Sequence, residues 1–398
     1  MNNVPNLRFP EFQGEWKRTI FKNVITLQRG SSPRPIIEYV TTSDDGVNWI
    51  KIGDMPHFGR IVTSTEEKIT KEGAKKSRQV NKGDLILSNS MSYGLPYIMG
   101  IDGYIHDGWF VLKNFENTFD KDYLCNLLIS SAIQNQYKRL AAGGVVQNIS
   151  SDLVNSVSVP IPTMMEQKKI SSLLNLIDER IATQNKIIED LKKLKCAISK
   201  HLFSRKDLLE TTIRLADIAT LKNGYAFQSS KYNIQGKWKI LTIANVSGGR
   251  YINEDACNCI INLPNDIQDH QVLKEGDILI SLTGNVGRVS LCKDGNYLLN
   301  QRVGLLHIMK NVNQEFLYQV LSSRRFENSM VACGQGAAQM NIGKGDVENF
   351  VLPYSSIANN IHLVARILHS YDECITNEQR ELTLLTMQKK YLLRQMFI

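Results

Sequence analysis

Basic, hydroxyl and amide side chains gather in several loop-like stretches in each half of the chain. In the first half they are Arg29, Ser31, Ser32, Arg34, Lys75, Lys76, Arg78, Ser90, Tyr93, Gln147 and Asn148. In the second half they are Lys222, Asn223, Tyr225, Gln228, Thr283, Asn285, Arg288, Asn300, Gln301, Arg302, Gln339 and Asn341. Cationic groups bind phosphates, whereas amide, guanidinium and hydroxyl groups hydrogen-bond to base edges. The residue types therefore indicate contacts to a nucleic acid, although any single stretch of this kind is also typical of a solvated loop.

Residue patterns of known catalytic and metal sites do not occur in the sequence. It has no GxxxxGK[ST] phosphate loop, since the nearest stretch, residues 284–288, lacks the lysine. It also has no HExxH zinc motif and no GxSxG nucleophile motif. The seven histidines lie apart, and the seven cysteines are scattered without a CxxC pair. We therefore expect no catalytic residue, no metal ion and no cofactor in this chain.

Length and composition narrow the class of protein. The 398 residues carry a formal net charge of +8, and 42% of them are hydrophobic, which is a globular balance. A chain of this length is expected to form two or more domains. No apolar run approaches the roughly 18 residues of a membrane span. Cysteines without pairing partners are typical of a reducing compartment, so we expect a cytoplasmic protein that does not bind a membrane.

The two halves of the sequence repeat one another. Residues 80–98 read VNKGDLILSNSMSYGLPYI and residues 273–291 read LKEGDILISLTGNVGRVSL, at an offset of 193 residues. Upstream, an offset of 194 pairs Gly30 with Gly224. A nearly constant offset through both halves indicates a tandem duplication.

The duplicated elements have to position the candidate residues. In each half, a stretch of about 140 residues is rich in strand patterns and turn signals, such as KGDLILS and EGDILIS. A short helical pattern lies near its end, over residues 121–139 and 314–331, and a long helix follows. We therefore expect an α+β fold, with two globular mixed α/β domains in a tandem pseudo-twofold repeat.

The long helices carry a heptad pattern. Within residues 166–203, positions alternating by four and three are Ile177, Ile181, Gln184, Ile188, Leu191, Lys195, Ile198 and Leu202. An offset of 194 turns them into Tyr371, Ile375, Glu378, Leu382, Leu385, Lys389, Leu392 and Met396. The matching phase predicts that the two helices pair through this seam as an antiparallel coiled coil. A parallel pair and two separate amphipathic helices are the alternatives.

Several motifs, in their order, resemble the DNA-specificity subunits of bacterial type I restriction–modification enzymes. Residues 7–12, LRFPEF, followed by Trp16, are similar to the start of that family. The two Gly-Asp strands resemble its target-recognition domains. Residues 159–170, VPIPTMMEQKKI, resemble the junction into its first conserved helical region, whereas the second junction, around residues 352–357, lacks the Glu-Gln pair.

The resemblance divides the chain into four segments. They are a first target-recognition domain with the N-terminal segment (1–162), a helical spacer region (163–206), a second target-recognition domain (207–353) and a second helical region (354–398). It implies that each domain reads one half of a bipartite, non-palindromic target in double-stranded DNA, and that the helices set the spacer between the halves.

The resemblance also implies partners and a division of labour. Two methyltransferase subunits would dock on the helical regions, and restriction and translocase subunits would join that core. S-adenosylmethionine, ATP and Mg would then be bound by these partners, and this chain would catalyse nothing itself. The alternatives are a free-standing bipartite DNA-binding regulator, a coiled-coil adaptor, and an enzyme with an unrecognised site. Salt-dependent DNA binding would separate the first of these from an adaptor.

Overall fold

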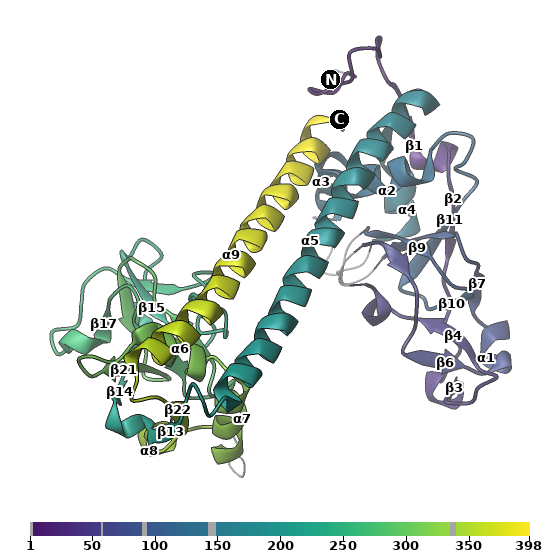
Figure 1. Ribbon diagram of the computed structural model, residues 1–398. Coiled ribbons are helices and arrows are strands. Elements are labelled where there is room, and N and C mark those ends of the chain that lie inside the picture. Colours follow the sequence, from purple (N-terminus) through teal and green to yellow (C-terminus); the bar gives the residue numbers. More distant parts are fainter. Residues whose placement is uncertain (1–2, 57–58, 90–93, 142–148, 335–339) are drawn as a thin grey trace. The chain divides into compact units, whose positions relative to one another are not determined.

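The computed structural model describes residues 3–56, 59–89, 94–141, 149–334 and 340–398 (Figure 1). The chain divides into two compact units. The first contains Met1–Lys186 together with Arg380–Ile398, and the second contains Ile187–Gln379. Each unit therefore combines one globular domain with one half of each long helix.

The described residues of the first unit form three sheets and four short α-helices, besides the long helices. Strands β1 (Lys17–Ile20) and β12 (Ser158–Ile161) pair antiparallel. One five-stranded sheet has the order β3 (Val40–Thr41), β6 (Glu67–Ile69), β4 (Val47–Ile50), β10 (Gly103–Ile105), β7 (Arg78–Val80). The other has the order β2 (Thr26–Arg29), β11 (Trp109–Lys113), β8 (Leu85–Ser88), β9 (Pro96–Met99), β5 (Ile61–Val62). The helices are α1 (Lys71–Lys75), α2 (Lys121–Ile129), α3 (Ser131–Ala141) and α4 (Ser151–Ser156).

The second unit repeats this plan. Strands β13 (Thr211–Arg214) and β22 (Val351–Tyr354) pair antiparallel. One four-stranded sheet has the order β14 (Ala219–Asn223), β21 (Val303–Ile308), β18 (Ile278–Ser281), β19 (Val289–Leu291). The other has the order β16 (Asn258–Ile260), β15 (Trp238–Leu241), β20 (Tyr297–Leu299), β17 (Val272–Leu273). The short helices are α6 (Gln314–Leu321), α7 (Arg324–Cys333) and α8 (Lys344–Glu348).

The topology of the two units confirms the duplication. We call the sheets that contain β4 and β15 the outer sheets, and those that contain β8 and β18 the central sheets. Within the residues that the structure describes, each outer sheet has one parallel pair, at equivalent places: β4 with β10 and β15 with β20. Strand β5, which pairs parallel to β9, corresponds in the second unit to a single parallel bridge between Tyr251 and Leu291. Strand β3 has no counterpart in the part of the second unit that the structure describes.

The repeated Gly-Asp motif forms a turn before a buried strand, as expected. Gly83 and Gly276 have φ angles of +93° and +86°, a region that glycine adopts without the steric cost of a Cβ atom. The following aspartates close the turns, because Asp84 and Asp277 each accept a hydrogen bond from the backbone N–H three residues earlier. All residues of β8 and β18 are buried. A strand buried on both faces explains the continuous apolar runs LIL and ILI.

The central sheet of each unit lies between two apolar cores. In the first unit, Leu85 and Leu87 belong to a core shared with α2 and the long helices, whereas Ile86 faces the core under the outer sheet. In the second unit, Ile278 faces the helices and Leu279 faces the outer sheet. Successive side chains of a strand point to opposite faces, so each strand contributes to both cores. The helices, the central sheet and the outer sheet thus form three layers.

The two short helical patterns are each broken into two helices. The first is divided at Ser130, whose backbone is extended (φ −63°, ψ 152°) and whose hydroxyl donates to the Leu127 carbonyl. The second is divided at Ser322 and Ser323, where the Ser323 hydroxyl accepts a hydrogen bond from the Phe326 N–H and caps α7. Serine competes with helical hydrogen bonding in this way, which the apolar periodicity alone does not reveal.

The long helices are α5 (Met164–Ser204) and α9 (Ala358–Gln395). The predicted seam residues are all buried or half-buried: Ile177, Ile181, Ile188, Leu191, Ile198, Leu202, Tyr371, Ile375, Leu382, Leu385, Leu392 and Met396. In the first unit, the beginning of α5 shares a core with the end of α9. In the second, the end of α5 shares a core with the beginning of α9. The helices are therefore antiparallel, as expected (Figure 1).

The Glu-Gln pair at the start of α5 anchors the N-terminal segment. Glu166 accepts hydrogen bonds from Arg8 Nε (2.8 Å) and Nη2 (3.0 Å) and from Trp16 Nε1 (3.1 Å). Gln167 accepts from the Asp120 N–H at 2.8 Å and donates to the Pro162 carbonyl. The motifs around residues 8, 16 and 166 therefore meet in one hydrogen-bonded cluster, centred on the Glu166 carboxylate. The second junction is capped differently, by Glu210, which accepts hydrogen bonds from the backbone N–H and hydroxyl of Ser356.

We expect the Glu166→Gln substitution to destabilise the first unit by about 2–4 kcal/mol, because it leaves the half-buried guanidinium of Arg8 without its carboxylate. Urea unfolding followed by tryptophan fluorescence measures this effect. Glu179→Gln, an exposed carboxylate on the same helix, is the matched control. Coincident unfolding curves for the Glu166→Gln variant and the unsubstituted protein would contradict this role of Glu166.

Candidate nucleic-acid interface

The predicted residues of the first half meet around Asp107. The Asp107 carboxylate accepts hydrogen bonds from the Ser32 hydroxyl at 2.8 Å and from Arg34 Nη2 at 3.1 Å. Its backbone carbonyl accepts from Asn89 Nδ2 at 2.9 Å and lies 3.4 Å from Arg29 Nε. We call Arg29, Ser32, Arg34 and Asp107 the first corner. Sequence reasoning missed Asp107, because a lone aspartate after a strand carries no signal of its own.

Electrostatics keep the first corner charged. Burial opposes ionisation of Asp107, but the hydrogen bond from Ser32, the backbone N–H of Asp107 itself, the charge of His106 when it is protonated and the charge of Arg34 together hold the pKa of this carboxyl below its ordinary value. Burial lowers the pKa of the neighbouring His106, whose Nδ1 atom accepts a hydrogen bond from the Gly108 N–H at 2.6 Å. The corner therefore presents an ionised carboxylate beside two guanidinium groups and a neutral imidazole.

A second group of predicted cations adjoins the first corner. The Ser31 hydroxyl donates to the Lys76 carbonyl at 3.1 Å, and Arg78 Nε donates to the Arg29 carbonyl at 3.2 Å. The side chains of Lys75, Lys76 and Arg78 are exposed. Residues near positions 30 and 76, far apart in the sequence, thus form one basic surface.

A glycine at the same place in each unit permits the corner to form. A Cβ atom on Gly30 would lie 2.0 Å from the His106 carbonyl oxygen, and one on Gly224 would lie 2.2 Å from the Asn300 carbonyl oxygen. Real side chains do not approach a backbone atom so closely. The repeated glycine therefore lets the loop after β2 or β14 approach the segment that joins the outer sheet to the central sheet.

The second unit brings its predicted residues together at the equivalent place. The Gln301 N–H donates to the Tyr225 carbonyl at 3.0 Å, and the Leu282 N–H donates to the Arg302 carbonyl at 3.0 Å. The side chains of Gln301 and Arg302 are exposed. We call Tyr225, Gln301 and Arg302 the second corner. Gln301 lies 194 residues after Asp107, so a comparison of the repeats would have identified Asp107.

Three further predicted residues border the second corner. Thr283 forms an antiparallel bridge with Asn341, and the Gly284 N–H donates to the Met340 carbonyl. Asn285, on the same turn, has an exposed side chain. These residues extend the second corner along the end of β18.

Other predicted residues make contacts within the protein. Asn300 is buried, and its Oδ1 atom accepts a hydrogen bond from the Arg302 N–H. Arg288 lies 3.7 Å from a carboxylate oxygen of Glu327 on α7. The Asn223 carbonyl lies 3.1 Å from His270 Nε2, and Lys222 is half-buried at the end of β14. Ser90, Tyr93, Gln147, Asn148 and Gln339 lie outside the described residues.

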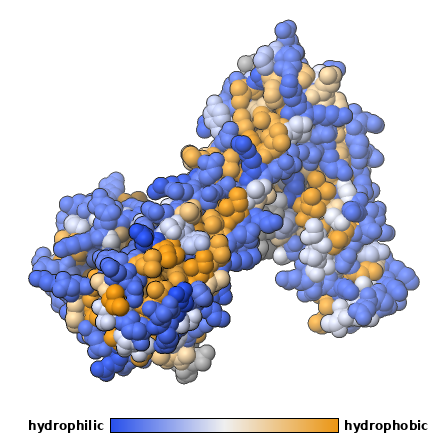
Figure 2. Space-filling model, viewed as in Figure 1, coloured by the Kyte–Doolittle hydropathy of each residue, from blue (hydrophilic) through white to orange (hydrophobic). Residues whose placement is uncertain are grey.

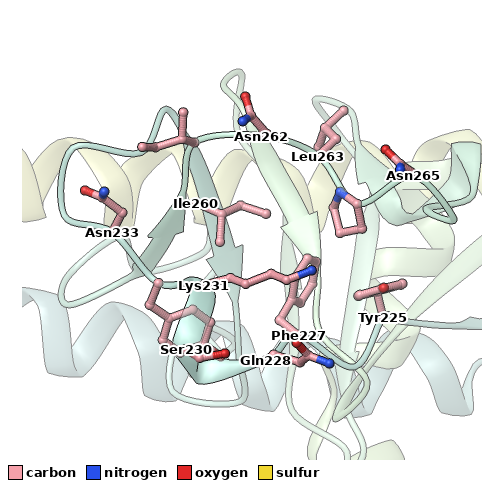
Figure 3. A pocket seen from close by; sticks show the side chains of 13 residues that line it. Tyr225, Phe227, Gln228, Ser230, Lys231, Asn233, Ile260, Asn262, Leu263 and Asn265 are labelled. Atoms are coloured by element: carbon pink, nitrogen blue, oxygen red, sulfur yellow. The ribbon is translucent and has the colours of Figure 1, made fainter.

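A cleft of about 500 Å³ opens beside Tyr225 (Figure 3). Its walls are the loop that contains Phe227 and Gln228 and the loop that contains Asn262 and Asn265. The Tyr225 and Phe227 ring centroids are 4.9 Å apart. Figure 3 shows the Lys231 side chain extending across the cleft. Aromatic faces and amide groups combined with one cation suit a nucleobase and its phosphate.

The Tyr225 hydroxyl is held at the edge of this cleft. It donates a hydrogen bond to Asp266 at 2.8 Å, and this bond raises the pKa of Tyr225. The phenol therefore stays protonated and fixed in direction. Sequence reasoning found Tyr225 and Gln228 but missed Asn262 and Asn265, because this second wall lies more than 30 residues farther along the chain. It also missed Lys231, which lies only three residues after Gln228.

Neither a metal centre nor a membrane span is present in the described ranges. No three or more His, Cys, Asp and Glu side chains lie close enough there to hold a metal ion. No helix there is both long and apolar enough to cross a bilayer.

Comparison with known proteins identifies the family. The profile of the family described as type I restriction modification DNA specificity domain matches residues 14–193 and, a second time, residues 210–387. The chain belongs to this family. The double match follows the two copies that the offset and the topology show.

Relatives and solved structures agree with this membership. The chain is 25% identical over 338 residues to the type I restriction enzyme MjaVIII specificity subunit of Methanocaldococcus jannaschii, covering 78% of this chain and 77% of that protein. It is 23% identical to the EcoKI specificity subunit of Escherichia coli K12, covering 91% and 84%. The fold is similar to that of the S subunit of the type I system of M. genitalium, with a TM-score of 0.58 and 17% identity over 99% of both chains.

A type I specificity domain with this corner geometry should not tolerate a side chain on its repeated glycine. We expect Gly30→Ala to destabilise the first unit by about 2–3 kcal/mol, because the added methyl group displaces the His106 backbone. Urea unfolding followed by tryptophan fluorescence measures the loss. Gly53→Ala is the control, because a Cβ atom at Gly53 meets nothing within 4 Å. Equal unfolding midpoints for the two variants would show that the loop does not need the close approach.

Proposed function

We propose that this chain reads a bipartite, non-palindromic DNA target as the specificity subunit of a type I restriction–modification enzyme. The observation that carries the proposal is that one scaffold occurs twice in a chain of this family, with different side chains at the same corner. One copy would read each half of the target. Different chemistry at equivalent positions is what two unlike half-sites require.

The two corners differ in the base contacts that they favour. The first corner offers guanidinium groups and a carboxylate, from Arg29, Arg34 and Asp107. Arginine pairs with guanine and carboxylates accept from cytosine in the major groove. The second corner offers Gln301, whose amide suits adenine, beside the aromatic cleft of Tyr225. We therefore infer a G·C-directed first half-site and an A·T-directed contact in the second.

The chemistry of the enzyme would reside in partner subunits. We infer that this chain is non-catalytic, and that S-adenosylmethionine, ATP and Mg are bound by modification and restriction subunits. Binding and orienting DNA need no general base or metal ion in the reading subunit, and chromosomal DNA as substrate makes the cytoplasm its compartment.

Exposed apolar side chains on the long helices favour these as the docking surface for two modification subunits. In the first unit, Met165 and Leu176 on α5 and Leu384, Met387 and Tyr391 on α9 are each about 60% exposed or more. Figure 2 shows apolar residues gathered near the C-terminal end of α9. Contiguous exposed apolar groups mark protein contacts in a chain of this kind. The fold is similar to that of a chain from a solved structure that concerns complex assembly of a type I restriction–modification system, with a TM-score of 0.58.

Replacing one recognition domain tests the function. Residues 211–354 begin and end in the paired strands β13 and β22, so they form a closed module. We expect exchange of this module for that of another family member to change one half-site and leave the other unchanged. The measurement is co-purification with the methyltransferase subunits, followed by sequencing of methylated adenines in genomic DNA.

The exchange of residues 17–161, which β1 and β12 bound, is the reciprocal control and should change only the other half-site. A change in both half-sites after either exchange would refute independent reading. If the protein co-purifies with no methyltransferase subunit, the result would favour a free-standing regulator or an adaptor.

Lengthening both long helices tests whether they set the spacer. We expect a heptad inserted after Lys186 of α5 and another after Gln379 of α9 to preserve the seam and add about 10 Å of helix. At about 3.4 Å per base pair, the spacer between methylated half-sites should grow by about three base pairs. An unchanged spacer, mapped by sequencing of methylated adenines, would show that the helices do not act as a ruler.

A further inference from the structure

A cluster of charged side chains ties the globular domain of the second unit to both long helices. Arg250 donates to Glu315 of α6 at 2.6 and 2.9 Å and to Asp372 of α9 at 3.0 Å. Lys195 of α5 reaches the other oxygen of Asp372 at 2.6 Å. Gln319 of α6 also donates to Asp372, at 2.7 Å. We call these five residues the second joint.

The first unit contains the same arrangement. Arg60 donates to Asp178 of α5 at 2.8 Å and to Asn126 of α2 at 3.0 Å. Lys389 of α9 pairs with the other oxygen of Asp178. We call Arg60, Asn126, Asp178 and Lys389 the first joint. In both joints an aspartate on one long helix receives a lysine from the other helix and an arginine from the globular domain.

The two joints occupy equivalent positions of the repeat. Asp178 and Asp372 are separated by 194 residues, and so are Lys195 and Lys389. The lysines occupy two of the four polar positions of the heptad seam, which apolar packing does not explain. Each arginine lies directly before a parallel pairing, β5 with β9 in the first unit and a single bridge to β19 in the second. Because both copies contain the joint, we infer that it has a role common to the two domains.

The contacts of a joint are directional as well as partly buried. The side chains of Arg250 and Asp372 are 10% and 7% exposed. Hydrogen bonds to charged groups require narrow ranges of distance and angle, whereas apolar contacts tolerate sliding. Replacing one member leaves the others as uncompensated charges. A joint therefore fixes the angle of a domain on the helix pair in a way that apolar packing alone does not.

The joints differ in strength. Arg250 contacts two carboxylates, and its guanidinium carbon lies 5.1 Å from the centre of the Tyr318 ring. Arg60 contacts one carboxylate, and its Nη1 atom is buried without a hydrogen-bond partner among the residues that the structure describes. The first joint accordingly contains fewer charged contacts than the second.

We propose that Asp178 with Arg60 and Lys389, and Asp372 with Arg250 and Lys195, are positioning residues that fix the angle of each recognition domain on the helices and so restrict the spacer length that the enzyme accepts. This inference rests on the proposed function. Because the first joint is weaker, the first domain supplies whatever tolerance for other spacers the enzyme has.

The test uses the complex with its methyltransferase subunits and DNA that carries both half-sites. The spacer is shortened or lengthened one base pair at a time, and methylation rates are compared. For Asp372→Asn, we expect the preference for the native spacer over its neighbours to fall about tenfold, the size expected when one coupled, partly buried charge contact is lost. For Asp178→Asn, where fewer contacts exist, we expect about threefold.

Matched controls separate positioning from mere stability. Glu179→Gln and Asp190→Asn change exposed carboxylates on α5, the helix that carries Asp178, and should leave the spacer preference unchanged. Lys389→Gln, which keeps the Arg60 contact, should give a smaller loss than Asp178→Asn. If a variant fails to assemble, the conservative Asp178→Glu and Asp372→Glu substitutions replace it, with partial loss of preference expected.

The outcomes are distinct. A uniform loss of methylation at every spacer length, or no change in preference, would refute positioning by the joints. Absence of spacer preference or of methylation in the unsubstituted complex would instead refute the proposed function.

Discussion

The apolar stripe of a long helix must be buried, and this requirement determines the architecture. Neither α5 nor α9 buries its seam against its own globular domain alone, so each unit is completed by a segment of the other helix: Leu392 of α9 packs in the first core, and Leu202 of α5 packs in the second. An antiparallel heptad pair satisfies both at once. As a consequence, each core includes residues of both helices. The heptad pairing fixes the register of α5 against α9, and each globular domain packs on the surface that the two helices form.

Above that surface, burial and exposure separate what is shared from what differs. The strands β8 and β18, their Gly-Asp turns and the close-approach glycines are constrained by packing and are the same in both units. The corners are exposed, and there Asp107 and Gln301 occupy one position with different chemistry. A duplicated scaffold of this kind can diverge in what it reads without a cost to its core.

Local patterns predicted the helical seam and the buried strands, because period and spacing are properties of neighbouring residues. The repeat was predicted by comparing the two halves at one nearly constant offset. Contacts between distant residues were beyond such patterns. The pair of Arg34 and Asp107 joins residues 73 apart, and the cleft joins the loops around Phe227 and Asn262; both depend on strand order, which the local sequence does not specify. The break between α2 and α3 at Ser130 was missed, because it depends on one hydroxyl that hydrogen-bonds to the Leu127 carbonyl, whereas the apolar periodicity continues through it. The assignment of individual residues to DNA contacts stays a prediction.

The chain closes its first unit late. Ile170, Leu174 and Ile177 of α5 lack their core partners Leu392, Met396 and Phe397 until residues 380–398 have left the ribosome, whereas the second unit uses one uninterrupted stretch, residues 187–379. The N-terminal segment waits as well, since the Leu7 N–H donates to the Gln395 carbonyl. During synthesis the second unit therefore has all its parts first, although it is encoded second. The part of the first core that residues 392–397 cover stays exposed until those residues are made. Nascent chains of this protein accordingly carry their chief aggregation risk in the half that was made first.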